Sequence, residues 1–254
     1  MSPGDGERDG EGTFQLEDIS FDGPNLDVPN PPAGTPYEEF EDYRTARLLE
    51  ANDLPTTADG IVHALQDQTG VLLAAAAHAA GSQSIGAAIP RLRQVVEGSD
   101  DQAAVEAAYA LGRLGDAAAR QTLVEAVSRP ADAYLSALVA AGYLAQLGDP
   151  IGFPKVEEGL GSGLSAIRML ACKQLYFFMP FDGANLPSGG PIDAAGAYQR
   201  ALQDPDPDIQ WQALAELRLL RSPATKSLLD AYVERAQDEG LRRVARETLE
   251  SLGS

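Results

Sequence analysis

A dense aromatic run followed by a long polar loop carries the side chains best suited to contacting a partner. Residues 173–181 read Lys-Gln-Leu-Tyr-Phe-Phe-Met-Pro-Phe, and residues 182–191 form a loop rich in Gly and Pro. Aromatic side chains contribute large contact areas at interfaces, and long loops in compact domains commonly carry function. We expect a partner-contact site there, the alternative being aromatic side chains that fill the core beneath a surface loop. Its predicted residues are Tyr176, Phe178, Phe181 and Asn185.

Six basic side chains recur along the chain and form a second candidate surface. A basic face of this kind could contact nucleic acid or a protein partner. Acidic residues such as Glu97, Glu125 and Glu157 are interleaved with them, so the alternative is a mixed, solvated face. The six basic residues are Arg91, Arg93, Arg120, Lys155, Arg200 and Lys226.

Side chains for catalysis or metal binding are scarce. The chain has two histidines, His63 and His78, and one cysteine, Cys172, which are too few for the usual metal ligand sets. We interpret the histidines as ordinary residues on helix faces and Cys172 as a small buried apolar residue. Residues 159–163, Gly-Leu-Gly-Ser-Gly, lack the lysine and the strand of a phosphate-binding loop. We therefore expect no catalytic residue, cofactor or metal, and the sequence leans against an enzyme.

The charge of the chain bears on the kind of partner it can bind. Thirty-eight acids and nineteen bases give a net charge of −19. Such a surface repels the phosphates of nucleic acid and disfavours nucleic acid as a partner. Only three of the bases are lysines, and an acidic surface poor in lysine also fits adaptation to a salty cytosol.

Three features of the sequence predict the cellular location of the protein. A single cysteine cannot form an internal disulfide, and residues 1–12 lack the basic-then-apolar order of a signal peptide. No apolar run approaches the roughly 20 residues that span a bilayer. We expect a cytoplasmic protein without membrane contact.

The composition divides the chain into two regions. Residues 1–36 are rich in Gly, Pro and acids, and we expect them to be disordered or extended. Two apolar clusters within them, Phe14–Phe21 and Leu26–Val28, leave open that this tail docks on its own domain or on a partner. Residues 37–254 carry apolar side chains at helical spacing and are expected to form one helical domain.

A repeated helix-ending mark runs through the second region. Leu-Gly-Asp occurs at 114–116 and at 147–149, so Gly115 and Gly148 are 33 residues apart, and Gly81 precedes Gly115 by 34. A fixed period of this size indicates a helical repeat array. Glycine ends a helix by taking the left-handed conformation, and aspartate caps the helix that follows. We therefore interpret Asp116 and Asp149 as structural caps and not as a catalytic pair.

Three stretches carry a family resemblance. They are Ala-Leu-Gly-Arg-Leu-Gly-Asp at 110–116, Gln-Leu-Gly-Asp-Pro at 146–150, and the segment that begins Asp-Pro-Asp-Pro-Asp at 204. Over about residues 68–253 the chain resembles HEAT repeats, and more narrowly the short HEAT-like repeats named after the phycobilisome lyases. The resemblance implies an armadillo-type, right-handed α-α superhelix. Some relatives resemble deoxyhypusine hydroxylase, which binds iron through paired His-Glu steps that this chain lacks.

The predicted solenoid has six helical pairs and a closing helix. We expect Trp211, which follows the cap at the start of the sixth pair, to pack in the core. The pairs are 37–51 with 56–66, 69–80 with 85–97, 101–114 with 116–128, 132–147 with 150–160, 163–179 with 192–203, and 207–221 with 223–237, followed by 239–252.

The leading functional interpretation is a protein-binding scaffold that holds a partner in the groove, which we expect the second helices to line. Fold alone does not determine function, so two alternatives stay open. One is a factor resembling the phycobilin lyases, with a small ligand or chromophore in the groove. The other is a nucleic-acid-binding HEAT-like protein that uses the six basic residues. The sequence names neither the partner nor the oligomeric state.

Overall fold

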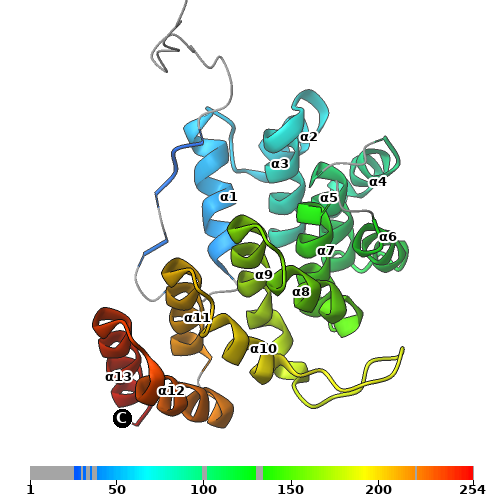
Figure 1. Cartoon of the computed structure of the whole chain (residues 1–254). Coiled ribbons are helices and arrows are strands. Elements are labelled where there is room, and N and C mark those ends of the chain that lie inside the picture. The colour runs from blue at the N-terminus through cyan, green and yellow to red at the C-terminus, as the bar shows by residue number, and fades with distance from the viewer. Residues whose placement is uncertain are drawn as a thin grey trace, which may run out of the picture.

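The protein is all-α throughout the residues that the structure describes. The computed structural model describes residues 26–29, 31–32, 35, 39–98, 102–129, 134–220 and 222–253. These residues form thirteen α-helices, three short 3-10 helices and one isolated β-bridge (Figure 1). The predicted all-α fold is confirmed, whereas most of the predicted tail, residues 1–36, lies outside the described residues.

The helices alternate between two layers, and each predicted pair is present within a few residues of its expected ends. The first helices are α1 (Phe40–Ala51), α3 (Gly70–Ser82), α5 (Gln102–Arg113), α7 (Tyr134–Gln146), α9 (Ser165–Phe178) and α11 (Pro207–Leu219). The second helices are α2 (Ala58–Asp67), α4 (Ile89–Gly98), α6 (Ala118–Val127), α8 (Phe153–Leu160), α10 (Ala194–Ala201) and α12 (Pro223–Arg235), and α13 (Glu239–Gly253) closes the array.

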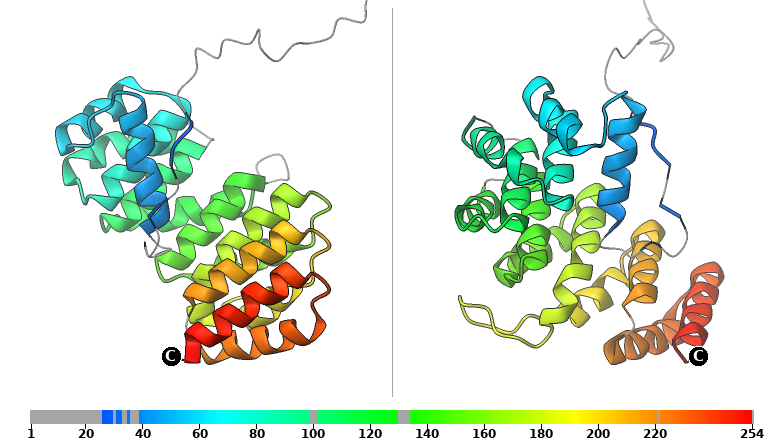
Figure 2. Two further views of the ribbon diagram at one scale, coloured as in Figure 1. Left: turned by 90° about the vertical axis from the view of Figure 1, so that its left-hand side faces the viewer. Right: turned by 180° about the vertical axis from the view of Figure 1, so that it is seen from behind.

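The first helices lie on the inner side of the curved array. Each of α3, α5, α7, α9 and α11 packs against the next, while α4, α6, α8 and α10 form the outer layer (Figure 1). The left-hand view of Figure 2 shows α7, α9, α11 and α13 side by side and nearly parallel. The expectation that the second helices line the groove is therefore wrong, because the first helices face inward.

Small residues explain why the first helices are inside. Helix α3 is rich in alanine, and a Cβ added to Gly81 would come 2.6 Å from the Cα of Ala110 on α5. Neighbouring first helices pack together more closely than neighbouring second helices do, and the array curves toward the first helices (Figure 1). Gly81 thus lies inside α3, and Ser84 (φ +55°) takes the left-handed position expected of that glycine.

Each predicted Leu-Gly-Asp mark ends a helix and links neighbouring pairs, but Asp149 caps the 3-10 helix η5 (Pro150–Gly152) in front of α8 and not α8 itself. Gly115 (φ +81°) and Gly148 (φ +86°) take the left-handed conformation. Asp116 accepts a hydrogen bond from the backbone N–H of Ala118, and Asp149 accepts one from Ile151. The other carboxylate oxygen of each aspartate forms an ion pair with an arginine of the preceding pair, over 2.7 Å for Arg93–Asp116 and 2.6 Å for Arg120–Asp149.

The core positions of α11 and α9 test two further expectations. Cys172 is fully buried, as predicted. Trp211 is 53% exposed, so the prediction that it packs in the core is wrong. Ile209, Ala213 and Leu217 occupy the buried face of α11, and a residue two positions after Ile209 points about 200° away around the helix.

The close approach of α3 and α5 leads to a first prediction. Gly81→Ala should lower the free energy of unfolding by about 2 kcal/mol, because the added methyl group meets a backbone atom that cannot rotate away. Gly86→Ala is the matched control, since a Cβ there meets nothing within 4 Å. Urea unfolding followed by circular dichroism measures both, and equal stabilities of the two variants would contradict the role given to Gly81.

Candidate functional site

A pocket of about 560 Å³ opens on the inner side of the array, where the ends of four helices meet. We call it the inner pocket. One side comes from the start of α1 and another from the ends of α5 and α7, and the aromatic run at the end of α9 forms the remainder. Its principal side chains are Glu39, Asp42, Tyr109, Arg113, Gln146, Tyr176, Phe177 and Phe181.

A buried charged network lies directly behind this pocket. The ring of His78 on α3 is 5% exposed and lies between two carboxylates, with Nε2 2.8 Å from Asp42 on α1 and Nδ1 2.9 Å from Glu106 on α5. The Tyr143 hydroxyl on α7 donates to Glu106 over 2.6 Å. Four successive first helices therefore meet at one imidazole, and the interpretation of His78 as an ordinary helix-face residue is wrong.

The network holds His78 protonated at neutral pH. Burial by itself would lower the pKa of His78, but the hydrogen bonds and charges of Asp42 and Glu106 raise it to about 9. Burial would raise the pKa of Asp42, and His78 and Arg113 outweigh it, so that this pKa lies below its ordinary value. Both ring nitrogens of the imidazolium can then donate, one to each carboxylate.

A stack of two tyrosines joins the network to the pocket wall. The rings of Tyr109 and Tyr143 lie 3.9 Å apart and nearly parallel, at 7°. The Tyr109 hydroxyl donates to Gln146 over 2.8 Å. The Arg113 guanidinium lies over the Tyr109 ring at 5.8 Å and 3.4 Å from Asp42. These contacts fix the wall in place before anything binds, which reduces the entropy lost on binding.

The aromatic run contributes to the pocket through only part of the predicted set. Tyr176 and Phe181 line the inner pocket, and so does Phe177, which the sequence analysis did not select. Phe178 is fully buried and packs against Phe153 with ring centroids 5.4 Å apart. Phe178 is therefore a core residue, because it lies on the face of α9 turned toward α8.

The predicted loop is an ordered protrusion. Asn185 pairs with Pro191 in the isolated β-bridge, and backbone hydrogen bonds join Gly183 to Ile192 and Leu186 to Gly190. Asn185 is exposed. Phe181 at the base of the loop belongs to the inner pocket, whereas the loop itself extends away from the helices (Figure 1).

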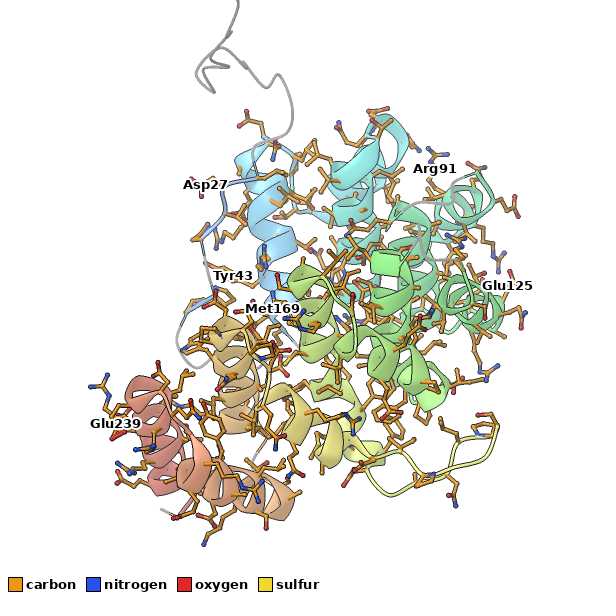
Figure 3. The ribbon with its side chains drawn as sticks, viewed as in Figure 1. Asp27, Tyr43, Arg91, Glu125, Met169 and Glu239 are labelled. Carbon is orange, nitrogen blue, oxygen red and sulfur yellow. The ribbon has the colours of Figure 1, made fainter. Side chains whose placement is uncertain are left out.

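The six predicted basic residues lie on the second helices, and acids of this chain neutralise most of them. Besides Arg93 and Arg120, Arg200 pairs with Glu157 over 2.6 Å and Lys155 pairs with Glu158 over 2.9 Å. Arg91 donates to the Leu65 carbonyl, and Lys226 is exposed on α12. Figure 3 shows Arg91 and Glu125 at the outer edge of the molecule. The structure does not bring the six together at the inner pocket.

The sequence contains a feature from which the network could have been predicted. His78 is the one titratable residue of the alanine-rich α3, and Glu106 is the one carboxylate of the alanine-rich α5. A charged side chain on the buried face of such a helix needs a partner of opposite charge. Their partners Asp42 and Tyr143 come from other repeats, and spacing alone does not identify them.

Two further findings concern membrane-spanning helices and clusters of metal ligands. No helix within the described ranges is both long and apolar enough to cross a membrane. In the same part of the chain, no group of three or more His, Cys, Asp or Glu side chains could hold a metal ion.

Comparison with known proteins finds likeness among solved structures only, since no family model and no curated protein matches. An engineered protein is 17% identical, with a TM-score of 0.45 over 77% of this chain and 96% of its own. The complex of CpcE and CpcF of phycocyanin lyase from Nostoc sp. PCC7120 is 18% identical, with a TM-score of 0.41 over 93% and 98%. A designed armadillo repeat protein in complex with the peptide (KR)4 is 14% identical, with a TM-score of 0.40 over 83% and 86%. Likeness at this level concerns stacked helices and carries no argument about function.

The His78 network makes stability depend on pH. The folded protein holds the His78 proton with a pKa of about 9 against an ordinary value of 6.5, a difference worth about 3 kcal/mol. This contribution is fully present below about pH 6.5 and is lost as the pH rises through about 9. The melting temperature of the wild type should therefore fall across that range.

His78→Gln should remove this fall and lower stability at pH 7 by about 3 kcal/mol, because the buried Glu106 and the partly exposed Asp42 lose their cation. His63→Gln is the matched control, since His63 is exposed on α2. Thermal melting from pH 6 to pH 9.5 measures all three proteins. Parallel pH profiles for the wild type and His78→Gln would show that His78 is not the titrating group.

Proposed function

We propose that this protein is a binding scaffold that holds a segment of a protein partner in the inner pocket. One observation carries the proposal: an aromatic-lined cavity of about 560 Å³ on the inner side of the solenoid. Its wall is held by the buried network and the tyrosine stack, so it does not need to form on binding. Solenoids commonly bind partners on such curved surfaces.

The repeat architecture supports a more specific family assignment. We propose that the chain is a divergent HEAT-like repeat protein of the type named after the phycobilisome lyases. The support comes from the Leu-Gly-Asp marks at 114–116 and 147–149, each of which ends one helix, accepts a backbone hydrogen bond from the turn that follows and binds an arginine of the preceding pair. The partner's identity does not follow from this assignment.

The loop between η6 (Met179–Phe181) and α10 is proposed as a second contact. Three glycines with positive φ, Gly183, Gly189 and Gly190, and the Asn185–Pro191 bridge give it a defined shape. An ordered loop loses less entropy on binding than a disordered one. Because Phe181 stands at its base, a partner segment that enters the pocket can continue along the loop.

A small ligand in the same pocket is the second candidate. The volume of about 560 Å³ falls within the range of roughly 300–1,000 Å³ that is usual for small-molecule sites. A chromophore or other small aromatic molecule would stack on the rings of Tyr176 and Phe181. A purified protein that carries absorbance above 320 nm, or a bound mass in native mass spectrometry, would favour this candidate.

The aromatic side chains of the pocket give the direct test of the scaffold proposal. The double variant Tyr176→Ala, Phe181→Ala should lose at least about 80% of a captured partner in affinity purification from the native host, because truncation of central aromatic residues costs about 2 kcal/mol or more. Trp211→Ala is the control, since it removes an exposed aromatic side chain from α11. If Trp211→Ala loses the partner and the double variant retains it, the binding surface is not the inner pocket.

Deleting residues 183–190 tests the loop. We expect weaker partner capture and a melting temperature lowered by no more than about 4 °C, because residues 183–190 make their backbone hydrogen bonds among themselves and to Phe181 and Ile192, and only the side chain of Leu186 packs against the core. An unchanged set of partners would remove the loop from the proposed interface. A melting temperature lowered by more than about 4 °C would instead show that the loop supports the fold.

A further inference from the structure

We infer that the inner pocket takes a cationic side chain, above all arginine, from a basic segment of the partner. This inference rests on the proposed function and adds the chemistry of the ligand. It depends on three observations: the charge left over in the pocket, the aromatic rings beside that charge, and a guanidinium of this chain that is already bound in the same way.

The charges at the pocket sum to an excess of negative charge. Behind and beside it, the positive His78 and Arg113 are balanced by Asp42 and Glu106, with which they pair. Glu39 lines the pocket at the start of α1 and is exposed, and it adds one carboxylate to this balanced set. The whole chain carries −19, so the long-range field also attracts cations and repels anions.

The aromatic side of the pocket suits a cation equally well. The rings of Tyr176 and Phe177 meet edge to face, with centroids 5.4 Å apart and planes at 85°. The faces of the two rings therefore point in different directions. Both side chains are partly exposed, as is Phe181. A cation within about 6 Å of such ring faces is stabilised by about 0.5–2 kcal/mol, depending on how far it is desolvated.

Arg113 shows this mode of binding within the chain itself. Its guanidinium lies over the Tyr109 ring at 5.8 Å and within 3.4 Å of the Asp42 carboxylate. An incoming guanidinium would find the same two elements among the residues that line the pocket, a carboxylate in Glu39 at the start of α1 and aromatic faces at the end of α9.

Arginine fits better than lysine or an anion. A guanidinium is flat, can stack on a ring and still donate in its plane to a carboxylate, whereas an ammonium is a strongly hydrated point charge. An anionic ligand would face Glu39 and Asp42, and the cations near it, Arg113 and His78, are already paired with carboxylates of this chain.

The test uses three capped, fluorescein-labelled decapeptides that differ only at three positions, occupied by arginine, by neutral citrulline of the same shape, or by glutamate. Fluorescence anisotropy against the full chain in 150 mM salt gives the affinities. We expect the arginine peptide to bind at least about fivefold more tightly than the citrulline peptide, in line with an exposed cation–π contact plus one ion pair. The glutamate peptide should bind more weakly than either.

Two variants test whether the preference for arginine over citrulline depends on Glu39. Glu39→Gln should reduce the preference for arginine over citrulline by about threefold, and Glu97→Gln, which removes an exposed carboxylate from α4, should leave it unchanged. Phe181→Ala should weaken both peptides. A preference for arginine that Glu97→Gln reduces as much as Glu39→Gln would reflect the general negative charge and would overturn the inference.

Equal affinities for arginine and citrulline, or tighter binding of the glutamate peptide, would also overturn it. These results leave the scaffold proposal standing, because that proposal is tested by partner capture with the Tyr176→Ala, Phe181→Ala variant. If capture does not depend on those two residues, the scaffold proposal fails whichever peptide binds.

Discussion

A protonated histidine between a buried carboxylate, Glu106, and a partly exposed one, Asp42, is the interaction on which the inner pocket depends. His78 connects α1 through Asp42 to α5 through Glu106, and Tyr143 extends the connection to α7. The charges of His78 and Glu106 would be costly to bury alone, and each is stabilised by the other and, for His78, by Asp42. The N-terminal end of α1 is thereby held against the inner side of the solenoid, where Glu39 and Asp42 form one wall of the pocket.

The size of side chains determines which layer of the solenoid is available for binding. Glycine and alanine at the contacts between α3 and α5 let the first helices approach closely, and the array curves toward them. The second helices spread outward and carry arginines that bind the capping aspartates of the next pair. Their positive charges therefore stabilise the stacking of repeats and are not free to form a basic binding face.

Local features of this fold were predictable from the sequence, and contacts between repeats were not. Helix ends and the caps at Asp116 and Asp149 depend on residues within one turn of each other, so spacing was enough to predict them. The pocket joins Glu39 to Phe181 across four helices, and a repeat period does not tell which side chains meet over that distance. Trp211 was assigned to the core by residue type, although the helical positions of its neighbours place it on the exposed face of α11.

The pocket forms where the repeat pattern is broken, and this explains why it is a distinctive site in a regular array. Identical pairs stacked at a constant step would fill each inner groove with the same side chains. Here Asp42 on α1 reaches past α3 to Arg113 on α5. At the other end, α9 continues into a 3-10 turn that carries Pro180 and Phe181 into the pocket. The regular repeats between them hold the carboxylates at the start of α1 and the aromatic end of α9 at one pocket, so a ligand that contacts both recognises the irregular ends and not the repeat.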